Sequence, residues 1–298
     1  MRTLVLTLAY DGTNYCGWQV QPNGASLQQV VEEALSEFVG EKVRVTAAGR
    51  TDAGVHAIGQ LASFHTASEI PLDGFRFGLT SKLPADIVVR DVAELPYGFN
   101  ARFDAVKKRY RYVIHTARTP WPWLRSYVWW HRGELDDVAM QAAAEVLVGT
   151  HDFRCFESQW PNKDTSVRTV FEARWRRCAE WGVWKACSAP THGMQPVGFW
   201  SGSRLSTLDS QPFLCFDIVA DGFLYNMVRA IVGTLVHVGR GRWTADDVRR
   251  ILDTGDRAHA GDTAPPQGLY LVDVETRVDP QRIAARLERW KLRKEAQG

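Results

Sequence analysis

The sequence predicts a mixed α/β (α+β) fold in which the order strand, helix, strand, strand, helix, strand occurs twice. In the first part of the chain, apolar and polar residues alternate as in strands near 1–9, 43–47, 61–65 and 87–92. Apolar residues at helical spacing place helices over 27–38 and 74–83. This order of elements is that of a ferredoxin-like split βαβ unit.

Start and stop signals at the ends of these segments support the assignment. Ser26 precedes the first helical run as an N-cap, and Gly40 ends that run. Pro84 stops the second helix, because proline lacks the amide that would continue the hydrogen-bond ladder. The first half therefore closes before residue 99.

The rest of the chain repeats the same order with additions. Strand patterns occur near 109–114, 167–178, 212–219 and 268–274. Helices are expected to begin near Asp136 or Asp137 and at Thr244, and residues 221–239 are expected to form a turn followed by a helix. The helix after Asp221 is long and mostly apolar, which predicts burial.

These patterns divide the chain into two halves and a tail. We assign residues 1–98 to an N-terminal half, 99–278 to a C-terminal half, and 279–298 to a basic C-terminal helix or tail that is expected to be peripheral. A stretch at about 179–211, rich in Trp, Gly, Ser and Pro, interrupts the second half as a long insertion. Loops of this length are commonly functional, and packing of its tryptophans onto the protein is the first interpretation.

Composition excludes several classes of protein. The chain is 45% hydrophobic and 23% charged, as in ordinary globular proteins, and no apolar run approaches the roughly 20 residues of a membrane helix. The first residues alternate like a strand and do not form a signal-peptide core. We therefore expect a cytoplasmic protein without membrane contact. A net charge of +2 identifies no nucleic-acid binder by itself, so local clusters of charge must decide.

The cysteines indicate neither a disulfide framework nor a metal site. Five are present, at Cys16, Cys155, Cys178, Cys187 and Cys215, and no two form a Cys-x-x-Cys pair. Such scatter is typical of reduced thiols. We predict no metal.

The stretch 48–56 is the strongest candidate for a catalytic loop. Glycines near both of its ends let the backbone turn, so a short connection between two strand-like runs presents three polar side chains. Its centre is Asp52, and Arg50 lies two residues earlier. A carboxylate at the mouth of a sheet suits nucleophilic catalysis. Taken alone, however, an Asp between glycines more often only forms a turn.

The whole string, Ala-Gly-Arg-Thr-Asp-Ala-Gly-Val-His-Ala, resembles the signature of the tRNA pseudouridine synthase A family. In that family the Asp of this string is the catalytic nucleophile, which implies this role for Asp52. The resemblance covers most of residues 3–275, with the insertion as its main gap. It implies two ferredoxin-like halves that form a central, mainly antiparallel sheet flanked by helices, with the active cleft between them.

A basic and aromatic segment follows the first half. Its cations fall within ten positions, at Arg102, Lys107, Lys108, Arg109 and Arg111. Basic residues interleaved with aromatic ones can bind phosphates and stack on bases. A strand with a solvated basic face and two core tyrosines would show the same pattern. We favour the core interpretation for Tyr110. The resemblance implies that Tyr112 is the tyrosine that contacts the substrate.

Arg229 lies in the long apolar helix, among neighbours that suggest burial. A buried guanidinium needs a carboxylate partner, and the resemblance implies that Arg229 pairs with the nucleophile. A dry cleft raises the pKa of a carboxylate, whereas a nearby arginine favours its ionised form. We therefore expect Asp52, Arg229 and Tyr112 to be catalytic.

The implied reaction isomerises uridine to its C-glycoside and needs no cofactor, since nothing is oxidised or reduced. The carboxylate attacks C1′ or C6, or initiates elimination at C2′, and the sequence does not choose among these routes. The uridine must first leave its stack. Arg50 is expected to fill the vacated space or hold a phosphate, and Arg102, Lys107 and Lys108 are expected to contact RNA.

The resemblance implies a homodimeric tRNA isomerase that acts on uridines 38, 39 and 40 of the anticodon stem-loop. The alternative is a non-catalytic tRNA-binding or tRNA-folding protein that retains the fold. Asp52, Tyr112 and Arg229 argue against it, because a pure binder has no need of a nucleophile and its counterion. A hydrolase is a third possibility, but no second carboxylate or metal cluster accompanies Asp52.

The segment 119–130 is dense in tryptophan and proline. Stacking on RNA is one interpretation, and a rigid aromatic loop that fills an edge of the core is the commoner structure. We expect the second.

Overall fold

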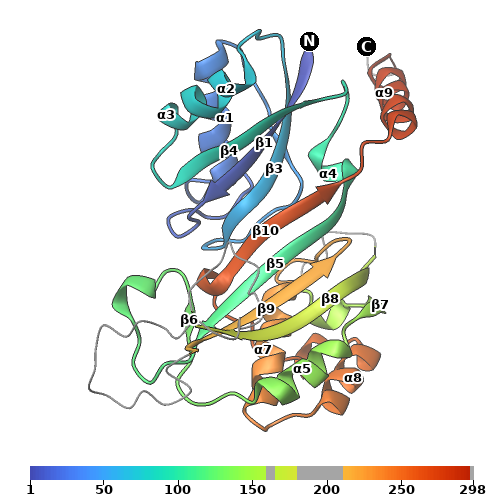
Figure 1. Ribbon diagram of the computed structural model, residues 1–298. Coiled ribbons are helices and arrows are strands. Elements are labelled where there is room, and N and C mark those ends of the chain that lie inside the picture. Colours follow the sequence, from blue (N-terminus) through green and yellow to red (C-terminus); the bar gives the residue numbers. More distant parts are fainter. Residues whose placement is uncertain (159–164, 180–210, 296–298) are drawn as a thin grey trace, which may run out of the picture. The chain divides into compact units, whose positions relative to one another are not determined.

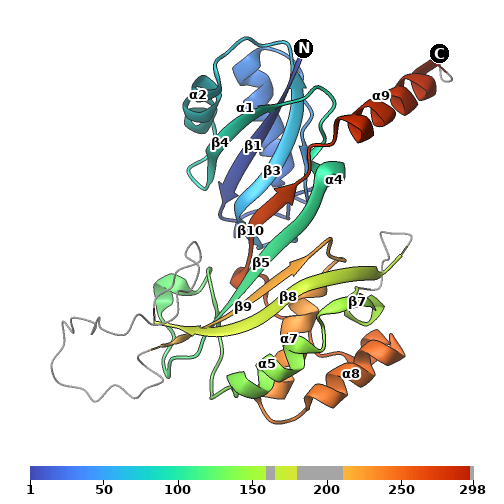
Figure 2. The same cartoon turned by 45° about the vertical axis from the view of Figure 1, so that its right-hand side comes forward.

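The computed structural model describes residues 1–158, 165–179 and 211–295, so the insertion predicted at about 179–211 lies almost wholly outside the described residues. The described chain forms two compact units (Figures 1 and 2). The first comprises Met1–Arg109 and Leu271–Gly298, and the second comprises Tyr110–Tyr270.

The first unit contains the predicted order of elements. Its strands and main helix are β1 (Arg2–Tyr10), α1 (Leu27–Val39), β2 (Thr46–Ala47), β3 (His56–Thr66) and β4 (Ile87–Leu95). Between β3 and β4 the chain is helical, through α2 (Leu72–Gly74), a π-helical turn (Phe75–Leu79) and α3 (Thr80–Lys82). The strand order β4-β1-β3-β2 is antiparallel throughout and is that of a ferredoxin-like unit. The helices lie on one face of these strands (Figure 1).

The strand expected over 43–47 forms only at its last two residues. The amide of Val43 donates to Ser36 Oγ at 3.0 Å, and that of Val45 donates to Glu32 Oε1 at 3.0 Å. Both acceptors are side chains of α1, so these backbone groups are satisfied without a strand partner. Val43 and Val45 are buried, as the alternating pattern predicts, but both lie outside the paired residues of β2.

The second unit carries the repeat. Its elements are β5 (Ala105–His115, which begins in the first unit), β6 (Trp129–Trp130), α5 (Asp137–Glu145), β7 (Gly149–Asp152), β8 (Val167–Cys178), β9 (Phe213–Ala220), α7 (Met227–Gly239), α8 (Ala245–Thr254) and β10 (Leu269–Thr276, which ends in the first unit). Helices α5, α7 and α8 pack together beside β8 (Figure 2).

The strand order repeats as well. The full order is β4-β1-β3-β10-β5-β9-β8-β7, with β2 beside β3 and β6 beside β5. Within it, β10-β5-β9-β8 corresponds to β4-β1-β3-β2 of the first unit. The predicted mixed fold with a large, mostly antiparallel sheet flanked by helices is confirmed.

Helix ends follow the predicted signals. Ser26 Oγ accepts the amide of Gln29 at the start of α1, and Gly40 ends the helix with φ of 70°. Asp136 caps α5. Thr244 and Asp247 form a reciprocal capping box at α8.

A buried ion cluster lies between β5, β8 and β9. Arg111 Nε and Nη2 donate to the two carboxylate oxygens of Asp217 at 2.8 and 2.9 Å, and Arg176 also donates to Asp217. Asp217 is 0% exposed and Arg111 is 3% exposed. The alternative of a solvated basic face is therefore wrong at Arg111.

Replacing Asp217 should destabilise the protein strongly. In Asp217→Ala two cations lose their carboxylate, and breaking a buried pair in this way costs about 3–5 kcal/mol. Urea unfolding of the full chain measures the loss. Asp246→Ala is the matched control, because it removes an exposed ion pair with Arg249 on α8 and should cost at most about 1 kcal/mol. Equal losses in both variants would contradict this account.

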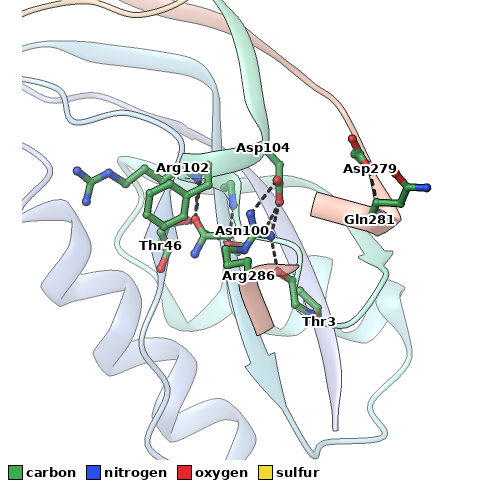
Figure 3. A network of polar contacts seen from close by, with 12 residues as sticks. Thr3, Thr46, Asn100, Arg102, Asp104, Asp279, Gln281 and Arg286 are labelled. Carbon is green, nitrogen blue, oxygen red and sulfur yellow. Dashed lines mark hydrogen bonds and ion pairs between the residues drawn. The ribbon is translucent and has the colours of Figure 1, made fainter. Parts of the chain in front are cut away.

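The C-terminal helix α9 (Pro280–Glu295) lies at the surface of the first unit and is anchored there. Arg286 Nη1 and Nη2 donate to the Asp104 carboxylate at 2.9 and 2.8 Å, and Nη2 also donates to Gly98 O at 2.6 Å (Figure 3). Asp104 lies in α4 (Ala101–Asp104) and accepts the amide of Asn100, the N-cap of that helix. Ile283 of α9 is buried.

The aromatic segment 119–130 packs only in part. Leu124 and Val128 are buried, but Trp121 is 37% and Trp123 68% exposed. The expectation of a loop that fills the core edge is therefore wrong for Trp123.

The cysteines also differ from expectation at one described position. Cys178 is disulfide-bonded, whereas Cys16, Cys155 and Cys215 are free, as expected of reduced thiols.

Candidate active site

The loop that carries Asp52 connects β2 to β3 in the first unit, and backbone hydrogen bonds hold it in place. Ala48 N donates to Leu61 O at 2.8 Å, and Val55 N donates to Asp52 O at 3.1 Å, which closes a turn directly after Asp52. Trp18 N donates to Thr51 O at 2.9 Å and ties the loop to the segment that follows β1. The loop is thus fixed on both sides of Asp52.

Two glycines allow the segment after β1 to approach this loop. A Cβ at Gly12 would lie 2.0 Å from Val55 O, and a Cβ at Gly17 would lie 2.7 Å from Thr51 O. Gly17 also has φ of +104°, which side chains rarely tolerate. The two backbones pack directly against each other, so no larger residue fits at either position.

The polar side chains of the loop point in different directions. Thr51 is buried, and its Oγ1 forms a hydrogen bond of 2.8 Å with the buried Tyr10 hydroxyl. Gln60 Nε2 donates to Gly49 O at 2.6 Å and supports the start of the loop. Asp52 is half-buried and Arg50 is exposed. Thr51 therefore anchors the loop, and Asp52, the next residue, remains partly accessible at its edge.

His56, the first residue of β3 after the loop, is buried. Its Nδ1 accepts the amide of Gly12 at 3.1 Å. This contact supports the close approach at Gly12.

Lys108, one of the predicted phosphate-binding residues, lies beside the start of the loop. A Cβ at Gly49 would be 3.3 Å from Lys108 Nζ. Lys107 lies on the opposite face of β5, as successive residues of a strand do, and pairs with Glu275 at 3.3 Å. Arg102 is exposed on α4, with its guanidinium 5.6 Å from the centre of the Phe103 ring. Lys108 is therefore at the Asp52 loop, and Lys107 faces away from it.

Tyr112 lies in the second unit and is 0% exposed. Its hydroxyl donates to Pro265 O at 2.7 Å, and its ring meets Trp129 edge to face at 6.1 Å. Burial raises the pKa of Tyr112 well above its ordinary value, and the positive charge of Arg229 opposes this shift only in part. The phenol is thus neutral and acts as a hydrogen-bond donor.

Arg229, on the first turn of α7, is half-buried in the same unit. Its Nε donates to Ala264 O at 2.7 Å, and its Nη1 donates to Asn226 Oδ1 at 2.8 Å. Ala264 N in turn donates to Arg229 O at 3.1 Å. The burial that the neighbouring apolar residues suggested is therefore only partly realised.

The segment 264–265 brings Tyr112 and Arg229 together, because their side chains bond to consecutive carbonyls of this segment. Sequence reasoning missed both these acceptors and Asn226. The two carbonyls lie 153 positions from Tyr112 and 35 positions from Arg229, so no local pattern marks them. The predicted site residues thus form two groups, with Asp52, Arg50, Lys108, Lys107 and Arg102 in the first unit and Tyr112 and Arg229 in the second.

Within the described parts of the chain, no group of three or more His, Cys, Asp or Glu side chains is arranged to hold a metal ion. The same parts contain no helix that is both long and apolar enough to cross a membrane.

Comparison with known proteins identifies the family. A family model described as tRNA pseudouridine synthase matches residues 7–104 and 143–276. Asp52 and Arg229 lie inside these matches, and Tyr112 lies between them.

Curated relatives agree. The chain is 43% identical over 274 residues to tRNA pseudouridine synthase A of Geotalea uraniireducens (strain Rf4), which covers 92% of this chain and 99% of the relative. It is 39% identical to the protein of the same name from Thermoanaerobacter sp. (strain X514), with the same coverage. A chain from the crystal structure of an archaeal box H/ACA sRNP Nop10-Cbf5 complex covers 86% of this chain and 57% of its own length at 10% identity, with a TM-score of 0.34. That similarity is too low to bear on fold or function. The matches to the family model and to the relatives place the chain in the tRNA pseudouridine synthase family, whose enzymes are isomerases that convert uridine to pseudouridine.

Proposed function

We propose that the protein isomerises uridines 38, 39 and 40 in the anticodon stem-loop of tRNA, with Asp52 as the nucleophile. The observation that carries the proposal is the loop itself. Backbone bonds and the inward-facing Thr51 fix it in place, and Asp52 stands half-buried at its rim. Such a loop holds a nucleophile at a defined position before substrate binds.

The reaction breaks the N1–C1′ bond, turns the uracil and forms a C5–C1′ bond. The hydrogen of C5 leaves as a proton, and a proton is taken up at N1, so atoms and electrons balance without a redox partner. The carboxylate acts by attack at C1′ or C6 or by initiating elimination at C2′, and each route needs a carboxylate in its ionised form. The proposal therefore includes no cofactor.

Arg229 is proposed as the counterion of Asp52. Its guanidinium is held in the second unit by Ala264 O and Asn226 Oδ1, and a guanidinium close to a carboxylate favours the ionised acid. Arg50, exposed beside the nucleophile, is proposed to fill the space left by the extracted base or to hold a phosphate.

Tyr112 is proposed to contact the uracil with its ring. That ring is 0% exposed without substrate, so the proposal requires the side chains that cover it to move when RNA binds. The raised pKa of the phenol and its bond to Pro265 O make the hydroxyl poorly suited to accept the C5 proton. Tyr112→Phe keeps the ring and removes only the hydroxyl. We therefore expect kcat to fall by much less than the roughly 10²-fold or more that follows the loss of a general base. Single-turnover assays measure this. A larger fall in a folded variant would show that the hydroxyl removes the proton.

Arg102, Lys107 and Lys108 are proposed to contact phosphates of the RNA. Lys108→Glu should weaken tRNA binding and reduce the slope of log K against log salt by about one for each lost phosphate contact. Lys107→Glu should do less, because Lys107 pairs with Glu275 on the other face of β5. Titrations at several salt concentrations test this, with the exposed Lys42→Glu as control. Unchanged affinity and slope in the Lys107 and Lys108 variants would exclude this pair.

The reaction class has a direct test. A tRNA transcript carrying tritium at C5 of its uridines should release tritium to water when incubated with the protein and no added cofactor, because the C5 hydrogen is lost on isomerisation. A transcript that binds but releases no tritium would contradict the proposal.

We also propose that the protein is a cytoplasmic homodimer, as the family resemblance implies. Sedimentation of the full chain tests this. A monomer at all concentrations would contradict the dimer.

A further inference from the structure

We propose that Asn226 is a positioning residue that fixes the orientation of the Arg229 guanidinium, and that Ser158 holds Asn226 in place. The inference rests on the proposed function, since it concerns the arginine assigned there as the counterion of the nucleophile.

The backbone of Asn226 is unusual. With φ of 61° and ψ of 5° it is left-handed, and within the described residues it is the one non-glycine residue with positive φ. Asparagine tolerates this conformation better than most residues do. The strained position lies one residue before α7 and three residues before Arg229.

The side chain of Asn226 does not form the hydrogen bond that is usual for an N-cap asparagine. Asparagine at an N-cap commonly accepts the amide of the second or third helical residue. Asn226 is the N-cap of α7 but makes no such bond. Its amide instead joins two side chains, because Oδ1 accepts from Arg229 Nη1 at 2.8 Å and Nδ2 donates to Ser158 Oγ at 2.7 Å.

The Ser158 hydroxyl bonds the Asn226 amide at its nitrogen. Because a guanidinium can only donate, the amide oxygen faces Arg229 and the amide nitrogen donates to Ser158 Oγ. Ser158 is itself tied to this turn, since its backbone amide donates to Tyr225 O at 3.2 Å. The result is a chain of bonds from Ser158 through Asn226 to Arg229.

Two bonds at different nitrogens fix the plane of the guanidinium. Nε is held by Ala264 O at 2.7 Å and Nη1 by Asn226 Oδ1. Loss of the second bond removes one of the contacts that hold this plane. Since Asn226 is neutral, it orients Arg229 without neutralising the charge that the nucleophile needs.

Asn226→Gly separates this role from backbone strain, because glycine adopts positive φ freely and yet removes both side-chain bonds. We expect kcat for pseudouridine formation to fall by about 10- to 100-fold, the size of effect that a misplaced catalytic group produces. KM and the melting temperature should be unchanged. Asn226→Asp keeps the left-handed backbone and an oxygen facing Arg229, with the Ser158 hydroxyl as donor, and should recover part of the lost rate.

A double-mutant cycle with Arg229→Lys shows whether Asn226 acts through Arg229. Lysine lacks the planar fork, so Asn226→Gly should lower kcat little further in the Arg229→Lys background. Ser158→Ala should lower kcat in the same direction as Asn226→Gly but less, because the bond to Arg229 remains.

The outcomes distinguish the inference from the proposed function. An active wild type in which Asn226→Gly leaves kcat unchanged, or lowers it equally with and without Arg229→Lys, would overturn the inference alone. A folded wild type that forms no pseudouridine would overturn the proposed function and this inference with it.

Discussion

Asp52→Asn should reduce pseudouridine formation by about 10⁴-fold or more, as the loss of a covalent nucleophile does in other enzymes. The carboxamide is similar in size to the carboxylate but is a far weaker nucleophile. Asp52→Asn leaves in place the loop bonds made by the backbone at positions 48, 49, 51, 52 and 55 and by the Thr51 hydroxyl. Single-turnover kinetics with a tRNA transcript measure the rate.

A matched control makes this result specific. Asp91→Asn changes an exposed carboxylate on β4 in the same unit and should leave the rate unchanged. Thermal melting and tRNA binding of the Asp52→Asn variant should match those of the wild type. A variant that retained more than about a hundredth of the rate would exclude Asp52 as an obligatory nucleophile.

Replacing Arg229 should have the second largest effect, and two substitutions divide it into geometry and charge. Arg229→Lys keeps the charge but loses the fork that bonds Ala264 O and Asn226 Oδ1, so kcat should fall by about 10²-fold. Arg229→Gln also removes the charge and should lower kcat further.

The pH dependence separates the two causes. If Arg229 favours the ionised form of Asp52, its removal lets the carboxylate take up a proton at higher pH. The acid side of the pH–rate profile should therefore move upward by about one pH unit or more in Arg229→Gln and stay in place in Arg229→Lys. Arg249→Gln, which changes an exposed arginine of α8, is the control. An unmoved profile in Arg229→Gln would contradict the counterion role.

Local signals were sufficient to predict most elements of the fold. The caps at Ser26, Gly40 and Thr244 act within a few residues of the chain, so the sequence shows both partners of each contact. The strand expected over 43–47 failed for the opposite reason. Its amides bond to Glu32 and Ser36 of the preceding helix, and strand periodicity carries no information about such partners.

The candidate site was predictable where its chemistry sits in one short string, as at Asp52. It was not predictable where contacts are distant in sequence. Arg111 is buried because Asp217, 106 positions later, pairs with it. The Tyr112 hydroxyl bonds a carbonyl 153 positions away. The role of Asn226 depends on Ser158, which lies 68 positions earlier. Such pairs become visible only once the strands bring them together.

The most direct test of the central claim is to map pseudouridine in unmodified tRNA transcripts that each retain one uridine among positions 38, 39 and 40, with cytidine at the other two. The wild type, without cofactor, should place pseudouridine at the retained position, and Asp52→Asn should form none. Pseudouridine only elsewhere in the transcripts would contradict the proposed target, and product that persisted in Asp52→Asn would contradict the nucleophile. Binding of every transcript with no product from any would instead favour a non-catalytic tRNA-binding protein that retains this fold.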